Sequence, residues 1–146
     1  YLNEIILSFK EISKKDFFFN FDQDSNPKII SKSIEIVYGL RNFIGNANKF
    51  SKNTIFINLK SDSETTEITI EDDGPGYPRD IVSKIGEPYL KSNYLKENSK
   101  AGLGLGLFIG KTLLEKNFAS VNCRNSKTRN GAEVIIRWKN KELFNI

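Results

Sequence analysis

The stretch Asp72-Asp73-Gly74-Pro75-Gly76 closes a run of alternating apolar residues, and Gly102-Leu103-Gly104-Leu105-Gly106-Leu107 opens a helix-like run further along the chain. A carboxylate on a glycine turn can accept a hydrogen bond from an adenine amino group. A glycine-rich turn that leads into a helix can bind phosphate oxygens through its backbone N–H groups. Asn46 lies upstream in a helical pattern and can supply an amide oxygen to a hard cation such as Mg²⁺. In this order, the three elements predict a nucleotide site.

The composition excludes several other functions. The 146 residues include one cysteine, Cys123, and no histidine, which excludes an internal disulfide, a histidine-based catalytic triad and most zinc sites. We expect Cys123 to have a buried apolar role in a strand. No stretch approaches the roughly 20 apolar residues of a membrane span. The net charge of +4 is spread over dispersed lysines, which argues against a nucleic-acid partner but suits attraction of a polyphosphate.

The spacing of apolar residues predicts an α+β fold. Helices are expected where apolar residues recur at three- and four-residue steps, over Ile34–Phe50 and Leu105–Lys116, with a short helix over Pro78–Ile85. Strands are expected where apolar residues alternate or aromatic residues cluster: Phe17–Phe21, Thr54–Lys60, Thr66–Glu71, Val121–Arg124 and Ala132–Trp138. About five strands, mostly joined as hairpins, favour a two-layer α/β sandwich with helices on one face of a mixed sheet.

One face of the first long helix is polar. Asn42, Asn46 and Lys49 follow one another at four- and three-residue steps, so they share that face. Two amides and one ammonium group can present oxygen to a metal ion and positive charge to phosphate. A solvated helix face is the alternative interpretation.

The two glycine segments also have ordinary alternatives. Asp-Gly is a common hairpin turn, although Gly-Pro-Gly-Tyr-Pro over residues 74–78 is too long for a tight one. The evenly spaced glycines of 102–106 match neither a Rossmann fingerprint nor a P-loop. The polar segment Gly86–Ala101 precedes them, and it could fold over bound phosphate as a lid through Lys91, Lys96 and Lys100.

Together these motifs resemble the N, G1 and G2 boxes of the ATP-binding domain of sensor histidine kinases, which has the Bergerat fold shared with gyrase, Hsp90 and MutL. The matching segments are Asn42–Phe50, Asp72–Gly76 and Gly102–Leu107. Gly131-Ala132-Glu133-Val134 resembles the closing strand of that family. Gly86-Glu87-Pro88-Tyr89 and the run Gly106–Glu115 are more specifically similar to redox-responsive sensor kinases of the RegB/PrrB/ActS type.

The resemblance implies a role for each motif. Asn46 would hold Mg²⁺, Asp72 would read adenine, and Lys49 with the lid lysines would contact the phosphates of ATP. Phe50 or Tyr77 would line the base pocket. The implied catalytic residues are Asn42 and Lys49. The implied nucleotide-binding residues are Asn46, Lys49, Phe50, Asp72, Gly74, Gly76, Tyr77, Lys91, Lys100, Gly102, Leu103, Gly104, Leu105, Gly106 and Leu107.

One departure from the wider superfamily affects the expected reaction. Gyrase-like ATPases place a general-base glutamate four residues before the metal-binding asparagine, and this chain has Asn42 there. An amide cannot take a proton from water. The resemblance therefore implies transfer of the γ-phosphate to a partner histidine, and not hydrolysis.

The resemblance also implies how this chain fits into a larger protein. Residues 1–15 would be the tail of an upstream helical segment or a linker, and residues 16–146 the ATP-binding catalytic domain. The acceptor histidine would lie on a dimerisation domain of the same protein, and a response regulator would be the next partner. The full-length protein is expected to be a homodimer anchored in the inner membrane, with this domain in the cytoplasm.

Two alternatives remain open at this point. The same fold serves stand-alone serine kinases of the anti-sigma-factor type. A degenerate domain that binds nucleotide, or nothing, and serves for interaction is the non-enzymatic alternative. Intact Asn46, Asp72 and the three glycines of 102–106 argue against degeneration.

Overall fold

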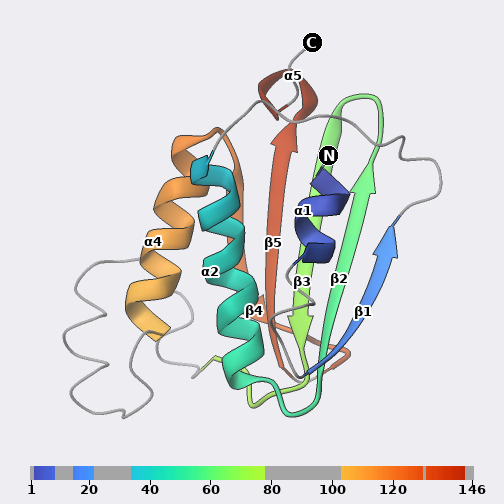
Figure 1. The fold of residues 1–146 in the computed structure, drawn as a ribbon, viewed down its shortest axis with the longest axis vertical. Helices are drawn as coiled ribbons and strands as arrows, with labels where there is room; N and C mark the ends of the chain where they lie inside the picture. The colour runs from blue at the N-terminus through green and yellow to red at the C-terminus, as the bar shows by residue number, and fades with distance from the viewer. Residues whose placement is uncertain (1, 9–14, 22–33, 78–102, 130, 144–146) are drawn as a thin grey trace.

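The computed structural model describes residues 2–8, 15–21, 34–77, 103–129 and 131–143. Its elements in chain order are α1 (Leu2–Ser8), β1 (Asp16–Phe21), α2 (Ile34–Phe50), β2 (Thr54–Ser61), β3 (Thr65–Asp72), α4 (Leu103–Lys116), β4 (Ser120–Asn125), β5 (Ala132–Lys139) and α5 (Asn140–Leu143) (Figure 1). All five predicted strands and both long predicted helices are confirmed. The expected short helix over Pro78–Ile85 and the expected lid Gly86–Ala101 lie outside the described residues.

The strands form one mixed sheet in the order β1-β2-β3-β5-β4. The strand β1 pairs with β2 in parallel, and the other three neighbouring pairs are antiparallel. A parallel pair needs a crossover connection, and α2 lies in the segment that joins β1 to β2. The chain then returns by the tight β2–β3 hairpin, so that β3 occupies the centre of the sheet and ends at Asp72.

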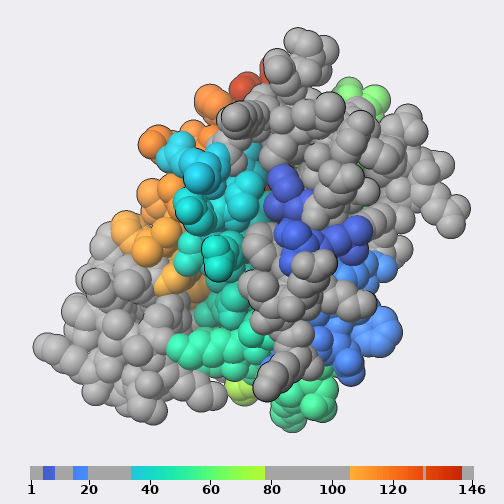
Figure 2. Space-filling view, in the orientation of Figure 1, coloured from blue at the N-terminus to red at the C-terminus, as the bar shows by residue number. Residues whose placement is uncertain are grey.

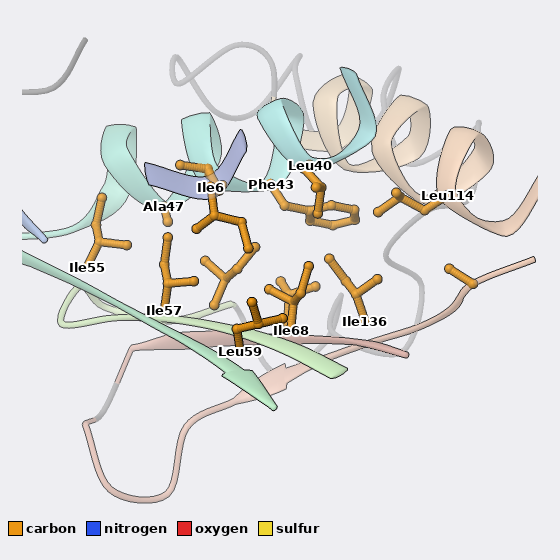
Figure 3. Close-up of a cluster of buried hydrophobic side chains, with 14 of the residues drawn as sticks. Ile6, Leu40, Phe43, Ala47, Ile55, Ile57, Leu59, Ile68, Leu114 and Ile136 are labelled. Atoms are coloured by element: carbon orange, nitrogen blue, oxygen red, sulfur yellow. The ribbon is translucent and has the colours of Figure 1, made fainter. Parts of the chain in front are cut away.

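The helices cover one face of the sheet, which makes two layers (Figure 1). The core between them combines Leu40, Phe43 and Ala47 of α2 with the alternate residues of the strands that face the helices (Figure 3). The fully buried strand residues are Ile55, Ile57, Ile68 and Ile136. Burial of each such side chain stabilises the fold by roughly 1.5–3 kcal/mol relative to exposure, so the period-two pattern of the strands determines which sheet face the helices cover.

The helix α1 adds to this core. Its Ile6 is fully buried and belongs to the same cluster of side chains. Part of the segment expected to be a tail or linker therefore packs with the domain. The boundary at residue 16 stays a prediction.

Two glycines allow α2 and α4 to pack closely; their outer surfaces lie side by side in Figure 2. A Cβ atom on Gly39 would lie 2.7 Å from Cγ of Leu114, and one on Gly110 would lie 2.9 Å from Cε2 of Phe43. Both distances are shorter than a normal carbon–carbon contact. The backbone of each helix thus lies directly against buried side chains of the other helix.

The opposite sheet face carries charged pairs and an aromatic stack. Arg137 of β5 pairs with Glu67 of β3 at 2.6 Å, and Phe18 of β1 stacks on Phe56 of β2 with ring centroids 5.6 Å apart. Within the part of the chain that the structure describes, no helix is both long enough and apolar enough to cross a membrane.

Gly39→Ala should lower the free energy of unfolding by about 1–3 kcal/mol, because the added methyl group overpacks the contact with Leu114. Gly45→Ala on the same helix is the matched control, since a Cβ there meets nothing within 4 Å. That control should gain about 0.5–1 kcal/mol from helix propensity. Urea denaturation of both variants makes the comparison, and equal stability of the two would contradict the close helix packing.

Candidate nucleotide site

The carboxylate of Asp72 is buried at the end of β3. The residue is 2% exposed. Its Oδ1 accepts hydrogen bonds from the backbone N–H groups of Gly74, at 2.8 Å, and Ala132, at 3.3 Å. Among the described residues, none donates a hydrogen bond to Oδ2. The backbone therefore fixes Oδ1, while the described part of the chain leaves Oδ2 without a donor.

Burial raises the pKa of Asp72 above the ordinary aspartate value. Desolvation disfavours the charged form, and the hydrogen bonds from Gly74 and Ala132 offset this only in part. The neighbouring charges of Asp73 and Glu71 raise the pKa further. A ligand that donates a hydrogen bond to this carboxylate would stabilise its charged form.

Three glycines shape the backbone around Asp72. A Cβ on Gly74 would overlap the carbonyl oxygen of Phe50, and one on Gly131 would overlap the backbone of Asp72 itself. Gly76 has φ of 79°, in the left-handed region that favours glycine. The roles predicted for Gly74 and Gly76 stay predictions as far as nucleotide is concerned, but both positions require glycine for the turn.

Asp73 connects the turn after β3 to the end of α2, a role that the sequence did not reveal. Its Oδ1 accepts hydrogen bonds from the backbone N–H groups of Lys52, Asn53 and Thr54, at 2.8, 3.1 and 3.2 Å. From the other side, Nζ of Lys15 donates to the carbonyl oxygens of Ser51, at 2.7 Å, and Lys52, at 3.0 Å. These bonds hold the C-terminal end of α2 beside Asp72.

The three residues of the predicted polar face of α2 differ in their contacts and in their exposure to solvent. Asn42 donates from Nδ2 to the carbonyl oxygen of Tyr38 at 2.8 Å, and its Cβ faces Gly110 of α4. Asn46 is half-buried one turn further on, and Lys49 is exposed. Nζ of Lys49 lies 5.7 Å from the ring centroid of Phe50, which is half-buried and packs against the core.

The start of α4 completes this end of the molecule. The helix begins at Leu103, two residues before the predicted start, so that Gly104 and Gly106 lie within its first turns. Leu107 is fully buried in the core. The N-terminal end of α4, the C-terminal end of α2 and the turn after β3 lie at the same end of the fold (Figure 1). The first backbone N–H groups of a helix have no partner within it and can bind an anion.

Tyr77 is 5% exposed and packs in the hydrophobic core. Its hydroxyl group lies beside the thiol of Cys123, and burial raises the pKa of Tyr77 well above its usual value. Cys123 is half-buried in β4, and burial raises the pKa of its thiol to about 11. The buried position of Tyr77 gives it a packing role. The predicted base contact through Phe50 or Tyr77 stays a prediction.

Sequence reasoning missed three further contacts at this site. Asn125 binds the backbone of Tyr77, Ser126 binds the carboxylate of Glu71, and Ala132 donates to Asp72. None of these residues belongs to a motif that predicts chemistry. The remaining predicted residues, Lys91, Lys100 and Gly102, lie outside the described residues.

Comparisons with known proteins identify the family of this chain. The family model for histidine kinase-, DNA gyrase B-, and HSP90-like ATPases matches residues 31–142. Sensor histidine kinase RegB of Cereibacter sphaeroides is 37% identical over 108 residues, which cover 70% of this chain and 23% of that protein. The chain thus spans less than a quarter of that relative.

Solved structures show the same fold. The nucleotide-free catalytic domain of histidine kinase ThkA matches with a TM-score of 0.73 at 22% identity, over 94% of this chain and 90% of that one. Full-length ShkA in complex with AMPPNP matches with a TM-score of 0.71 at 19% identity, over 99% of this chain and 30% of that one.

The chain belongs to the family of histidine kinase-, DNA gyrase B- and HSP90-like ATPases. Within that family it is similar to sensor histidine kinases, of which RegB is one. The predicted fold class and the predicted family are both confirmed.

Asp73→Asn should destabilise the domain at neutral pH and much less in acid. Partial burial raises the pKa of Asp73, but the backbone hydrogen bonds from Asn53, Thr54 and Lys52 outweigh it, so the folded-state pKa is lowered. The stabilisation is then present above the unfolded-state pKa of roughly 3.9 and is lost as the pH falls through the folded-state pKa. Urea unfolding should show a loss of about 1 kcal/mol at pH 7, the typical difference between hydrogen bonds to a charged and to a neutral acceptor.

The exposed carboxylate of Glu142 provides the control for this prediction. Glu142→Gln removes a charge without removing a hydrogen bond that holds the α2–β2 turn. A destabilisation by Asp73→Asn that is equally large on both sides of the folded-state pKa would contradict the charged role of Asp73.

Proposed function

We propose that this chain binds ATP together with Mg²⁺ and transfers the γ-phosphate to a histidine on a dimerisation domain of the same protein. The observation that carries the proposal is the carboxylate of Asp72, which is buried and held through Oδ1, while no described residue donates a hydrogen bond to its Oδ2. An adenine amino group is the hydrogen-bond donor that fits this acceptor. Family membership and the AMPPNP complex of the similar ShkA structure support ATP as the nucleotide.

The phosphates would lie between α2 and the N-terminal end of α4. We assign Asn46 to Mg²⁺, and Lys49 with Lys91 and Lys100 to the phosphates. Within the described ranges, no cluster of three or more His, Cys, Asp or Glu side chains could hold a metal ion. A cation at this site would then depend on the nucleotide phosphates, water and a small number of protein oxygens, which is how Mg²⁺ usually binds beside phosphates.

Transfer to a protein acceptor is favoured over hydrolysis by the position of Asn42. Its amide is engaged with the carbonyl oxygen of Tyr38 at 2.8 Å, and an amide cannot act as a general base. What this chain contributes to phosphoryl transfer is positioning and charge neutralisation. The acceptor histidine must come from elsewhere, because this chain contains none.

The similarity to RegB supports a larger assembly around this domain. We propose that the full-length protein is a homodimer held together by its histidine-bearing helices, with a response regulator as the acceptor of the next transfer. This domain would work in the cytoplasm, while the full-length protein is anchored in the inner membrane.

Asp72→Asn should weaken ATP binding at least about tenfold, because a hydrogen bond to a charged acceptor is worth roughly 1.5–3 kcal/mol. The fold should remain intact. Asparagine can still accept through Oδ1 from Gly74 and Ala132, and it removes a buried charge whose raised pKa indicates desolvation. Titration calorimetry measures the affinity, and urea unfolding at pH 7 measures the stability.

Two results would count against the adenine contact. Wild-type affinity in a well-folded Asp72→Asn variant would exclude Asp72 as the reader of adenine. An equal loss of ATP affinity in Asp62→Asn, on the β2–β3 hairpin turn, would show that the effect comes from the change in net charge and not from a contact with adenine.

Phosphoryl transfer is tested with labelled γ-phosphate. The chain alone should bind ATP but neither phosphorylate itself nor turn ATP over appreciably. Addition of a fragment that carries the dimerisation helices and their histidine should restore phosphorylation in trans.

Asn46→Ala should abolish the dependence of nucleotide binding on Mg²⁺, because it removes the proposed oxygen ligand.

The outcome of the phosphate-transfer assay distinguishes a histidine kinase domain from an ATPase and from a degenerate interaction module. Robust ATP turnover by the chain alone would favour an ATPase. Binding of ATP without transfer to the correct fragment would favour a degenerate interaction module.

A further inference from the structure

We propose that the turn between β4 and β5 determines how strictly the site selects adenine, with Asn125 and Ser126 as positioning residues for Asp72. The inference rests on the proposed role of Asp72 as the reader of adenine. Neither residue reaches the free oxygen of Asp72 in the contacts described above. Each acts on the segment that holds Asp72 in place.

Asn125 fixes the far end of the turn that begins at Asp72. Its Oδ1 accepts from the backbone N–H of Tyr77 at 2.6 Å, and its Nδ2 donates to the carbonyl oxygen of Tyr77 at 3.0 Å. A side-chain amide thus imitates the paired hydrogen bonds of two antiparallel strands. The turn from Asp72 to Tyr77 is therefore tied to the last residue of β4.

Ser126 fixes the near end. Its Oγ donates to Oε2 of Glu71, the residue before Asp72, at 2.7 Å, and both residues are 7% exposed. The same Oγ accepts from the backbone N–H of Arg129 at 3.1 Å, and the N–H of Ser126 donates to the carbonyl oxygen of Gly131 at 2.7 Å. The hydroxyl group thus orders its own turn and ties that turn to the end of β3.

Arg129 holds the turn from the open face of the sheet. Its guanidinium group lies 3.6 Å above the ring of Phe56, and its Nε lies 3.6 Å from Oε2 of Glu71. A guanidinium group stacked on an aromatic ring is attracted by the partial negative charge of the ring face. Two residues of the turn, Ser126 and Arg129, thus contact the same carboxylate oxygen of Glu71.

These contacts matter because the same turn donates to Asp72. Gly131 lies against the backbone of Asp72, and the N–H of Ala132 binds Oδ1 at 3.3 Å. The placement of that N–H fixes the plane of the carboxylate and hence the direction of Oδ2. If the turn shifts, Oδ2 no longer points at the adenine amino group.

A positioning defect and a general structural defect affect binding differently. Among the described residues, the proposed phosphate contacts are Lys49 of α2 and the N-terminal end of α4, on the helical side of the site. A shift of the β4–β5 turn should therefore weaken the contribution of the adenine amino group and leave the phosphate contribution unchanged. The quantity to measure is the ratio of affinities for ATP and for purine riboside 5′-triphosphate, which carries hydrogen in place of that amino group.

Calorimetric titration of both nucleotides against the chain measures this ratio. For the wild type it should be at least about tenfold, the equivalent of one charge-assisted hydrogen bond. The three test variants are Asn125→Ala, Ser126→Ala and Arg129→Ala. Their controls remove the same type of side chain from an exposed position of β4 or β5 away from Asp72; in the same order they are Asn122→Ala, Ser120→Ala and Arg137→Ala. We expect the ratio of affinities to fall at least about threefold in the three variants, which is roughly half of a tenfold effect in free energy, while the controls keep the wild-type ratio.

Arg129→Ala keeps the test decisive if the other variants fold poorly, because the Arg129 side chain is 41% exposed. Discrimination in the wild type with an unchanged ratio in folded variants would overturn this inference and leave the proposed function standing. An equal loss of affinity for ATP and for purine riboside 5′-triphosphate would also overturn it, since that result would show that the β4–β5 turn only stabilises the fold. ATP binding by the wild type without discrimination would overturn the role of Asp72 and this inference with it.

Discussion

The hydrogen bonds that hold Oδ1 of Asp72 are the constraint on which the site depends. They join the end of β3 to its own following turn through Gly74 and to the start of β5 through Ala132. The adjacent carboxylate of Asp73 joins the same turn to the end of α2. Three segments that are far apart in sequence thus meet at two neighbouring aspartates. The buried charge of Asp72 costs stability, as its raised pKa indicates, and the proposed contact with adenine would be the reason to retain it.

Much of the fold could be predicted because each element has one buried face. The strands alternate buried and exposed residues, and α2 repeats its apolar residues at helical spacing, so the pattern predicted their positions within a few residues. The parallel pairing of β1 with β2 could not be predicted in this way, because strand pairing depends on which edge of the sheet is available. The close contact at Gly39 and Gly110 was also not predicted, since a glycine within a helical pattern does not reveal what packs against it.

The same limit applies to the site. Asp72, Asn46 and the glycines of α4 could be found because they belong to motifs whose chemistry is local. Asn125 and Ser126 could not, because their role comes from contacts with Tyr77 and Glu71, which are distant in sequence. Phe50 or Tyr77 was expected to line the base pocket, and the sequence did not reveal that Tyr77 also packs in the core. A sequence motif predicts which residues can carry the chemistry, whereas the residues that position them are identified only from contacts in the folded chain.

The most direct test of the central claim is to measure the pKa of Asp72 with and without ATP. An NMR titration of its labelled carboxyl carbon gives this pKa. In the free domain, burial should hold this pKa above the ordinary aspartate value of roughly 3.9. An adenine amino group that donates to Oδ2 favours the charged form, so ATP should lower the pKa of Asp72, and the affinity for ATP should rise as the pH increases through it. A pKa of Asp72 that stays the same when ATP saturates the domain would contradict the account.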